Sequence, residues 1–170
     1  IAVGIREDGS KEVLGYTIAP TESAYNWQEL LEELKDRGVE DVLLFVSDGL
    51  KGMADAVFNV FPKAKYQVCL VHVARNIMHK VRVEDRKEVC EDFKMIHQAK
   101  GAEAAKEALE TFCEKWGKSY KKVAQGLREN PYLLTFYSFP KAIWRSIYST
   151  NLIESFNKQI KKYTKRKEQF

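Results

Sequence analysis

Val42–Gly49 (VLLFVSDG) opens with a continuous apolar run and ends in the polar turn Ser-Asp-Gly. Branched and aromatic side chains favour a β-strand, and a strand that is apolar on both faces is usually covered by helices on both sides. The run therefore predicts a strand over 42–46 in an α/β sheet. Ligands of such sheets bind beyond the carboxyl ends of the strands, where Asp48 stands.

The segments on either side complete an α/β pattern. Residues 1–5 and 13–18 flank a turn signal and predict the two strands of a β-hairpin. The spacing of apolar residues predicts helices after Ser23 and after Gly52, and 66–71 predicts a second apolar strand. The expected order in this part of the chain is β-β-α-β-α-β.

After His72 the strand signal ends, and apolar residues recur at helical spacing as far as a final helix that follows Thr150. We therefore expect three parts. A sheet part covers 1–72, an all-helical insertion covers 73–150, and a last helix with a basic tail covers 151–170.

Composition excludes several classes of protein. Hydrophobic residues make up 45% and charged residues 31% of the 170, which is typical of a globular chain. No apolar run approaches the ~20 residues of a membrane span, and no signal peptide is recognisable. The 3 cysteines fit a reducing compartment better than a disulfide framework. We expect a cytoplasmic protein without a membrane segment.

Because the chain begins within a strand and ends in charges, we also expect a fragment of a longer protein.

Basic residues are concentrated near the carboxyl end. The chain has 28 Lys and Arg against 24 Asp and Glu, a formal net charge of +4. A local cluster of positive charge fits a polyanion such as DNA, and a solvated terminal helix is the alternative. The cluster consists of Lys158, Lys161, Lys162, Lys165, Arg166 and Lys167.

Cys69 and His72 form a Cys-x-x-His pair at the expected end of the second apolar strand. This spacing occurs in zinc sites, but such a site needs three or four protein ligands, and His79 and Cys90 match no common finger spacing. We therefore expect no zinc. Cys69 should be buried as a small apolar side chain, and His72 should face Asp48.

Asp48 and Glu154 are the acids with a possible chemical role. Asp48 could merely cap the helix that follows it, and Glu154 could be a capping-box or first-turn acid after Asn151. Alternatively, the two could hold a metal ion beside a phosphate backbone, because Glu154 leads into the basic cluster. The residues alone leave both interpretations open.

Three motifs in this order resemble the Mutator-type transposases of bacterial insertion sequences. They are Ser47–Gly49 (SDG), Cys69–His72 (CLVH) and Tyr148–Ser155 (YSTNLIES). The last is followed by 161–166 (KKYTKR), and the resemblance extends over essentially the whole chain from Ala2–Ile5 (AVGI) onward. Each motif is weak alone, but their order is specific.

The resemblance implies a ribonuclease-H-like mixed sheet flanked by helices, with the helical insertion before the last catalytic acid. It implies cutting and strand transfer on double-stranded DNA, at transposon ends and target, by an Asp-Asp-Glu triad that holds two divalent ions, Mg²⁺ or Mn²⁺. Asp48 matches the second aspartate and Glu154 the glutamate, with Cys69 and His72 near the site. A homo-oligomer associated with the bacterial nucleoid is implied as well. The expected DNA-binding residues are Asn157, Lys158, Lys161, Lys162, Lys165 and Arg166.

The family's first aspartate and its strand lie before Ile1. We therefore expect these residues to lack the first strand of the sheet and to be catalytically incomplete, the sheet being closed by strand exchange or direct pairing. Two other functions stay open: a nuclease or resolvase on the same fold, and a non-catalytic DNA-binding module. Trp144 and Arg145 could clamp a flipped base, but a core patch around Trp144 is favoured.

Overall fold

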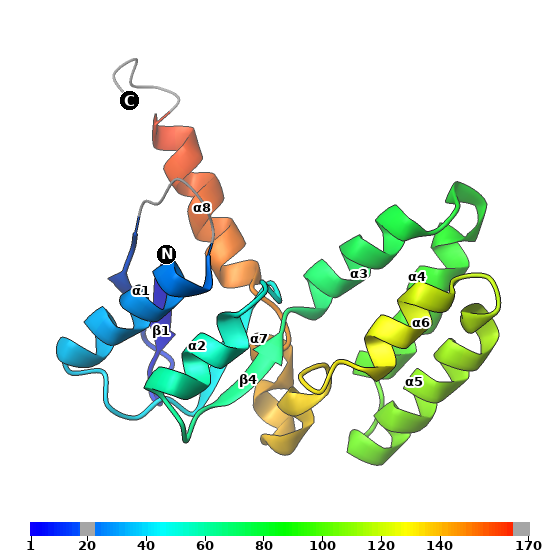
Figure 1. Cartoon of the computed structure of the whole chain (residues 1–170), viewed down its shortest axis with the longest axis horizontal. Coiled ribbons are helices and arrows are strands. Elements are labelled where there is room, and N and C mark those ends of the chain that lie inside the picture. The colour runs from blue at the N-terminus through cyan, green and yellow to red at the C-terminus, as the bar shows by residue number, and fades with distance from the viewer. Residues whose placement is uncertain (18–22, 165–170) are drawn as a thin grey trace. The chain divides into compact units, whose positions relative to one another are not determined.

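The computed structural model describes residues 1–17 and 23–164 (Figure 1). The chain divides into two compact units. The first consists of Ile1–Phe45, Leu50–Ala64 and Thr150–Phe170, and the second of Val46–Gly49 and Lys65–Ser149. Helices and strands occur in both units, so the mixed α/β class predicted from the sequence is confirmed.

The first unit begins with the predicted hairpin. Strand β1 (Ala2–Ile5) pairs antiparallel with β2 (Lys11–Gly15), and Val3 lies opposite Val13. Gly9 has a φ of 82°, a left-handed conformation that glycine adopts without steric cost and that closes the turn. The return strand thus starts before the expected 13–18, whose last residue lies outside the described residues.

Two helices follow the hairpin and pack against each other (Figure 1). Helix α1 (Ala24–Asp36) starts where the Ser23 hydroxyl accepts a 3.2 Å hydrogen bond from the backbone of Asn26. Helix α2 (Met53–Val60) starts after Gly52, at a φ of 79°. A Cβ atom at Gly52 would lie 2.5 Å from that of Ala24, so the close approach requires glycine. The helices bury Leu30, Leu31, Leu34, Ala56, Val57 and Val60.

Strand β3 (Leu44–Ser47) overlaps the strand predicted over 42–46, but begins at Leu44 and extends to Ser47, and it pairs with β4 (Lys65–Val68). The strand expected over 66–71 is too long, because helix α3 (Leu70–Lys80) begins at Leu70. The backbone of Leu70 donates a 2.8 Å hydrogen bond to the Tyr148 carbonyl, and Val73 donates to the Cys69 carbonyl in the first helical turn. The Cys-x-x-His pair therefore lies at the start of a helix.

The strands of the described residues pair as two two-stranded sheets, β1–β2 and β3–β4. The single mixed sheet expected from the sequence is therefore not confirmed, and the ribonuclease-H-like fold remains a proposal. The functional boundaries drawn at 72 and 150 also remain predictions.

The remainder of the second unit is helical, as predicted. Helices α4 (Arg86–His97), α5 (Ala102–Gly117) and α6 (Lys121–Arg128) lie side by side (Figure 1). Their facing sides bury Val89, Phe93, Ile96, Phe112, Trp116, Val123 and Leu127. Short 3-10 turns at Val83–Asp85, Thr135–Ser138 and Lys141–Ile143 and the short helix α7 (Trp144–Ile147) complete the unit.

Helix α8 (Asn151–Thr164) is the predicted last helix and belongs to the first unit. It begins directly after the buried Thr150, whose carbonyl accepts a 3.1 Å hydrogen bond from the backbone of Glu154. Glu154 therefore lies in the first helical turn, where a negative charge is favoured by the helix dipole.

Candidate active site and DNA interface

Asp48 follows the last residue of β3, and its side chain is 48% exposed. Two hydrogen bonds of Ser47, one from its backbone and one from its side chain, hold the end of the strand. The Ser47 carbonyl accepts a 2.7 Å hydrogen bond from the backbone of Cys69, and the Ser47 hydroxyl bonds that of Tyr66 on β4. Burial raises the pKa of the Tyr66 phenol, and the Asp48 carboxylate adds to this increase. The strand end thus presents an accessible carboxylate on a fixed backbone.

His72 reaches this carboxylate from the first turn of α3. Its Nε2 atom lies 3.8 Å from Oδ2 of Asp48, and its side chain is 23% exposed. The distance is too long for a direct hydrogen bond but places the imidazole beside the carboxylate. The same Nε2 atom lies 3.5 Å from NH1 of Arg75, one turn further along α3. Asp48, His72 and Arg75 therefore form a continuous polar row within the second unit.

Sequence reasoning placed Asp48, Cys69 and His72 near one another but missed Arg75. The available signal was its position three residues after His72, which puts both side chains on one face of a helix. That signal was hidden because 66–71 was interpreted as a strand.

Cys69 is fully buried, as expected of a small apolar side chain. It is the residue that precedes α3, and it has no exposed area. Among the described residues, no group of three or more His, Cys, Asp or Glu side chains gathers in a way that could hold a metal ion. The expectation about zinc is not tested by this finding and remains a prediction.

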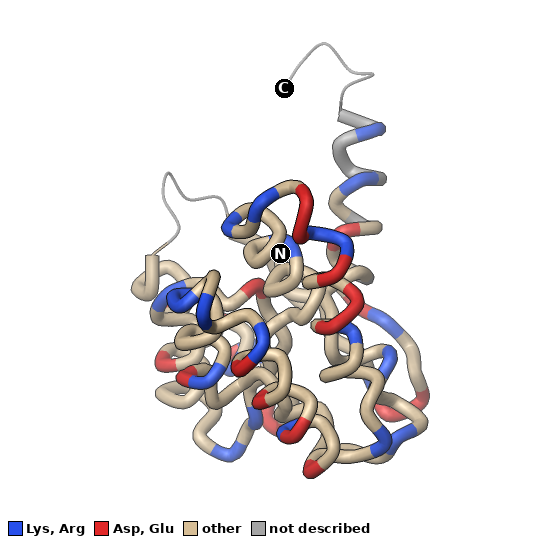
Figure 2. The backbone as a smooth tube through the Cα atoms, turned by 90° about the vertical axis from the view of Figure 1, so that its right-hand side faces the viewer, with Lys and Arg blue, Asp and Glu red and all other residues tan. Residues whose placement is uncertain are grey.

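Glu154 and Asp48 belong to different units of the structure. Their convergence on one metal site, predicted from the sequence, therefore stays a prediction. Glu154 is partly exposed, and the side chains of Lys158 and Lys162 further along α8 are exposed. Figure 2 shows Lys and Arg positions along this helix.

Of the other residues predicted to bind DNA, the structure describes the side chain of one. Asn157 is half-buried in α8. Lys161 lies in the same helix, but its side chain is outside the described part, as are residues Lys165 and Arg166.

Trp144 belongs to an aromatic cluster. Its indole N–H donates a 2.7 Å hydrogen bond to the Phe139 carbonyl, and its ring lies edge-on to Phe136 and Tyr137, with centroid distances of 6.0 and 4.7 Å. A ring held in this way is part of the packing of the second unit. Because Trp144 is only partly buried and Ile143 is exposed, neither the core patch nor the base clamp with Arg145 is decided, and both stay predictions.

No helix of the described residues is long and apolar enough to cross a membrane. An acid at a strand end and a lysine-bearing helix are features that fit a protein acting on nucleic acid. All of the chain, residues 1–170, matches the model of the family described as "Transposase, Mutator family". The chain therefore belongs to the Mutator family of transposases.

Similar proteins are named as transposases of insertion sequence elements. The chain is 52% identical over 171 residues to the transposase for insertion sequence element IS1201 of Lactobacillus helveticus, covering 100% of this chain and 46% of that protein. It is 48% identical over 167 residues to the transposase for insertion sequence element IS905 of Lactococcus lactis subsp. lactis (strain IL1403), covering 98% and 43%. The chain thus spans about half the length of the curated relatives it matches.

Proposed function

We propose that the protein containing this chain is a DNA transposase that cuts transposon ends and transfers the cut strands to a target, with Asp48 and Glu154 as two of its catalytic acids. The observation that carries the proposal is the position of Asp48. It is accessible, it stands at the carboxyl end of a strand, and it has His72 beside it, in a chain of a transposase family.

The donors fit a hard divalent cation. Carboxylate oxygens are the ligands that Mg²⁺ prefers, and an exposed carboxylate leaves room for phosphate oxygens and water. When bound, Mg²⁺ or Mn²⁺ would supply the activation of the attacking oxygen and the stabilisation of the leaving one.

The chain's own groups would orient this chemistry. The hydrogen bonds of Ser47 would hold the strand end that carries Asp48, and His72 would limit the movement of the carboxylate from the side of α3. Arg75 provides a guanidinium within the same row, where a phosphate oxygen would be attracted.

The lysines of α8 would hold the DNA backbone. Lys158 and Lys162 are exposed and follow Glu154 on the same helix, so a strand bound by them would pass the proposed catalytic acid. Phosphate contacts of this kind give affinity without base specificity. The family pattern places one further aspartate ahead of Ile1. A polypeptide of residues 1–170 alone would then hold two of three acids and should not cut DNA.

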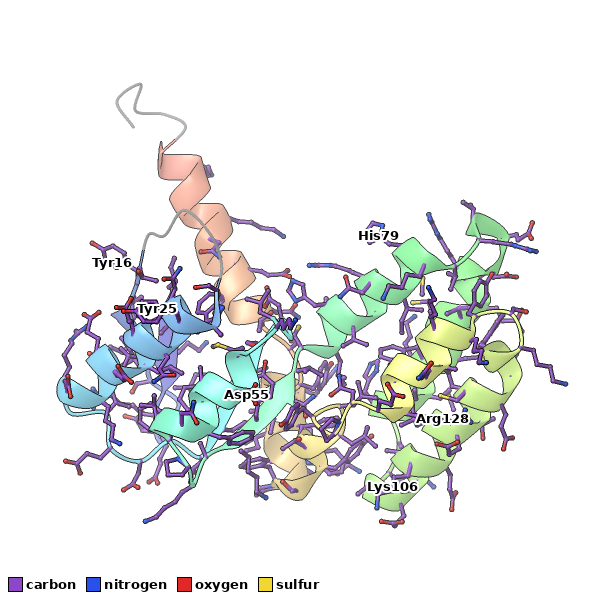
Figure 3. The ribbon with its side chains drawn as sticks, in the orientation of Figure 1. Tyr16, Tyr25, Asp55, His79, Lys106 and Arg128 are labelled. Carbon is purple, nitrogen blue, oxygen red and sulfur yellow. The ribbon has the colours of Figure 1, made fainter. Side chains whose placement is uncertain are left out.

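The test uses the full-length protein, supercoiled plasmid carrying the transposon ends, and Mg²⁺. Asp48→Asn and Glu154→Gln should each abolish cleavage and joining while DNA binding persists. Asp55→Asn is the matched control, because Asp55 is an exposed acid on α2 (Figure 3) and should keep full activity.

Each alternative function predicts different products. A nuclease or resolvase would give cleaved or recombined DNA that depends on Asp48 but no strand-transfer product. A DNA-binding module would leave all activity of the parent protein intact in Asp48→Asn. Either result would refute the proposed transposase chemistry.

A further inference from the structure

We propose that the outward face of α3 binds the sugar-phosphate backbone of the DNA strand that is cut at Asp48. This α3 face consists of His72, Arg75, Asn76, His79 and Lys80. The inference rests on the proposed function and adds a second DNA contact, on the second unit, to the one expected on α8.

Helical geometry gathers these residues on one side of α3. Positions separated by three, four or seven residues lie on the same face, as His72, Arg75, Asn76 and His79 do. Arg75, Asn76, His79 and Lys80 are all exposed. Figure 3 shows His79 projecting from the side of α3 that is turned away from α5 and α6.

The opposite side of the helix is apolar and explains why the polar face is turned outward. Leu70 and Ile77 are buried, and Val81, just after the helix, is buried as well. The α3 face is therefore fixed in orientation by the packing of the second unit, and its side chains can bind without a rearrangement of the backbone.

Charge distinguishes α3 from α4 and α5, whereas α6 (KKVAQGLR) and α7 (WRSI) also lack acidic residues. The sequence of α3 (LVHVARNIMHK) contains no acidic residue, and every polar side chain on its face can donate a hydrogen bond. In contrast, α4 (RKEVCEDFKMIH) and α5 (AEAAKEALETFCEKWG) mix acids with bases and pair Lys94 with Glu91 and Lys106 with Glu103. A face that is rich in donors and carries no acid of its own complements a polyanion.

The position of the α3 face connects it to the proposed chemistry. It begins at His72, 3.8 Å from the Asp48 carboxylate, and continues through Arg75, 3.5 Å from His72. From His72 to His79 the helix rises about 10 Å. At about 3.4 Å of rise per nucleotide, this length matches roughly three steps along one strand. The phosphates of a DNA strand bound along this face would therefore run toward Asp48.

The test measures binding of the full-length protein to DNA of transposon-end sequence as a function of salt concentration. Arg75→Gln combined with Lys80→Gln should lower the slope of log K against log[salt] by about 2, one unit per lost phosphate contact. Asn76→Glu, which places a carboxylate on the α3 face, should weaken binding further at every salt concentration.

Arg128→Gln is the matched control. Arg128 is exposed on α6 (Figure 3), and its guanidinium is paired with Glu110 at 2.8 Å, so the slope should not change. Circular dichroism should show the same helix content in all variants. If the Arg75 and Lys80 double variant and Asn76→Glu bind like Arg128→Gln, the α3 face does not contact DNA.

Different experimental outcomes would refute the inference and the proposed function. If Asp48→Asn abolishes cleavage while the α3 variants bind normally, only the inference is wrong. If Asp48→Asn cleaves like the wild type, the proposed function is wrong, and a reduced salt slope would then describe DNA binding alone.

Discussion

The backbone N–H of Phe136 donates a 2.8 Å hydrogen bond to Oε1 of Gln67, although these residues lie far apart in the sequence. Gln67 is fully buried in β4, and its amide nitrogen donates to the carbonyls of Val68 and Leu133 at 2.7 and 3.0 Å. The hydrogen bonds of one polar side chain therefore link β4 to the segment that follows α6. Since buried polar groups are costly without partners, this amide contributes to the stability of the second unit.

We predict that Gln67→Leu lowers the free energy of unfolding by about 3 kcal/mol, because it leaves the Phe136 N–H and the Leu133 carbonyl unpaired at about 1–3 kcal/mol each. Urea denaturation measures the change. The control is Gln125→Leu, since Gln125 is exposed on α6 and its side-chain amide donates a hydrogen bond to the exposed Glu129. A loss no larger than the control's would mean that Gln67 has no such role.

The environment of Tyr137 predicts that the fold loses stability at alkaline pH. The buried hydroxyl of Tyr137 donates to the Ile96 carbonyl at 2.7 Å, and burial raises its pKa from 10.0 to about 12. The folded state thus holds the phenolic proton more tightly than the unfolded state. The resulting stabilisation is complete below about pH 10 and is lost as pH rises towards about 12.

Tyr137→Phe removes this titration and should cost about 1 kcal/mol at neutral pH, where a buried carbonyl loses its donor. The difference in stability between wild type and variant should therefore shrink between pH 10 and 12. Thermal unfolding at several pH values measures it, and a difference that stays constant over this interval would contradict the prediction.

His72→Asn should reduce DNA cleavage by the full-length protein about tenfold, because the imidazole beside Asp48 no longer orients the carboxylate. The variant should also need a higher Mg²⁺ concentration for half-maximal cleavage, while its fold is retained because His72 is not part of the apolar core. Titration of Mg²⁺ in the cleavage assay tests this. Unchanged rate and unchanged Mg²⁺ dependence would show that His72 is only a neighbour of Asp48.

Replacing Lys158, Lys161 and Lys162 by Gln should lower the salt slope of DNA binding by about 3, if each lysine contacts one phosphate. Lys106→Gln is the control, because Lys106 on α5 (Figure 3) pairs with Glu103 at 2.8 Å. Filter binding at several salt concentrations measures the slope. A slope equal to the control's would mean that this part of α8 is a solvated helix.

The helices were predictable because their apolar residues recur at helical spacing. Leu30, Leu31 and Leu34 of α1, and Val89, Phe93 and Ile96 of α4, are buried as that spacing implies. The boundary between β4 and α3 was not predictable in the same way. Leu70 and Val71 end the 66–71 segment, whose apolar residues suit a strand, but they fold as the start of a helix, and the backbone of Leu70 donates a hydrogen bond to distant Tyr148.

The site was predictable only in part, for physical reasons. The position of Asp48 follows from the end of an apolar strand, which sequence pattern reveals. The burial of Gln67 depends on tertiary contacts, which no local pattern contains, whereas the contact between His72 and Arg75 is local but requires the segment to be known as a helix. The absence of acids from α3 is visible in the sequence, but it acquires meaning only when the segment is known to be a helix.

The hydrogen bond from the Leu70 N–H to the Tyr148 carbonyl limits how the length and sequence of this region can vary. Helix α3 begins without a side-chain cap from Cys69, and Tyr148 provides an acceptor from its main chain. Every amino acid has such a carbonyl, so this contact is indifferent to the side chain at position 148. An inserted or deleted residue between Pro140 and Tyr148 would instead move a different carbonyl into its place. For this contact, the length of the segment is therefore constrained more tightly than its composition.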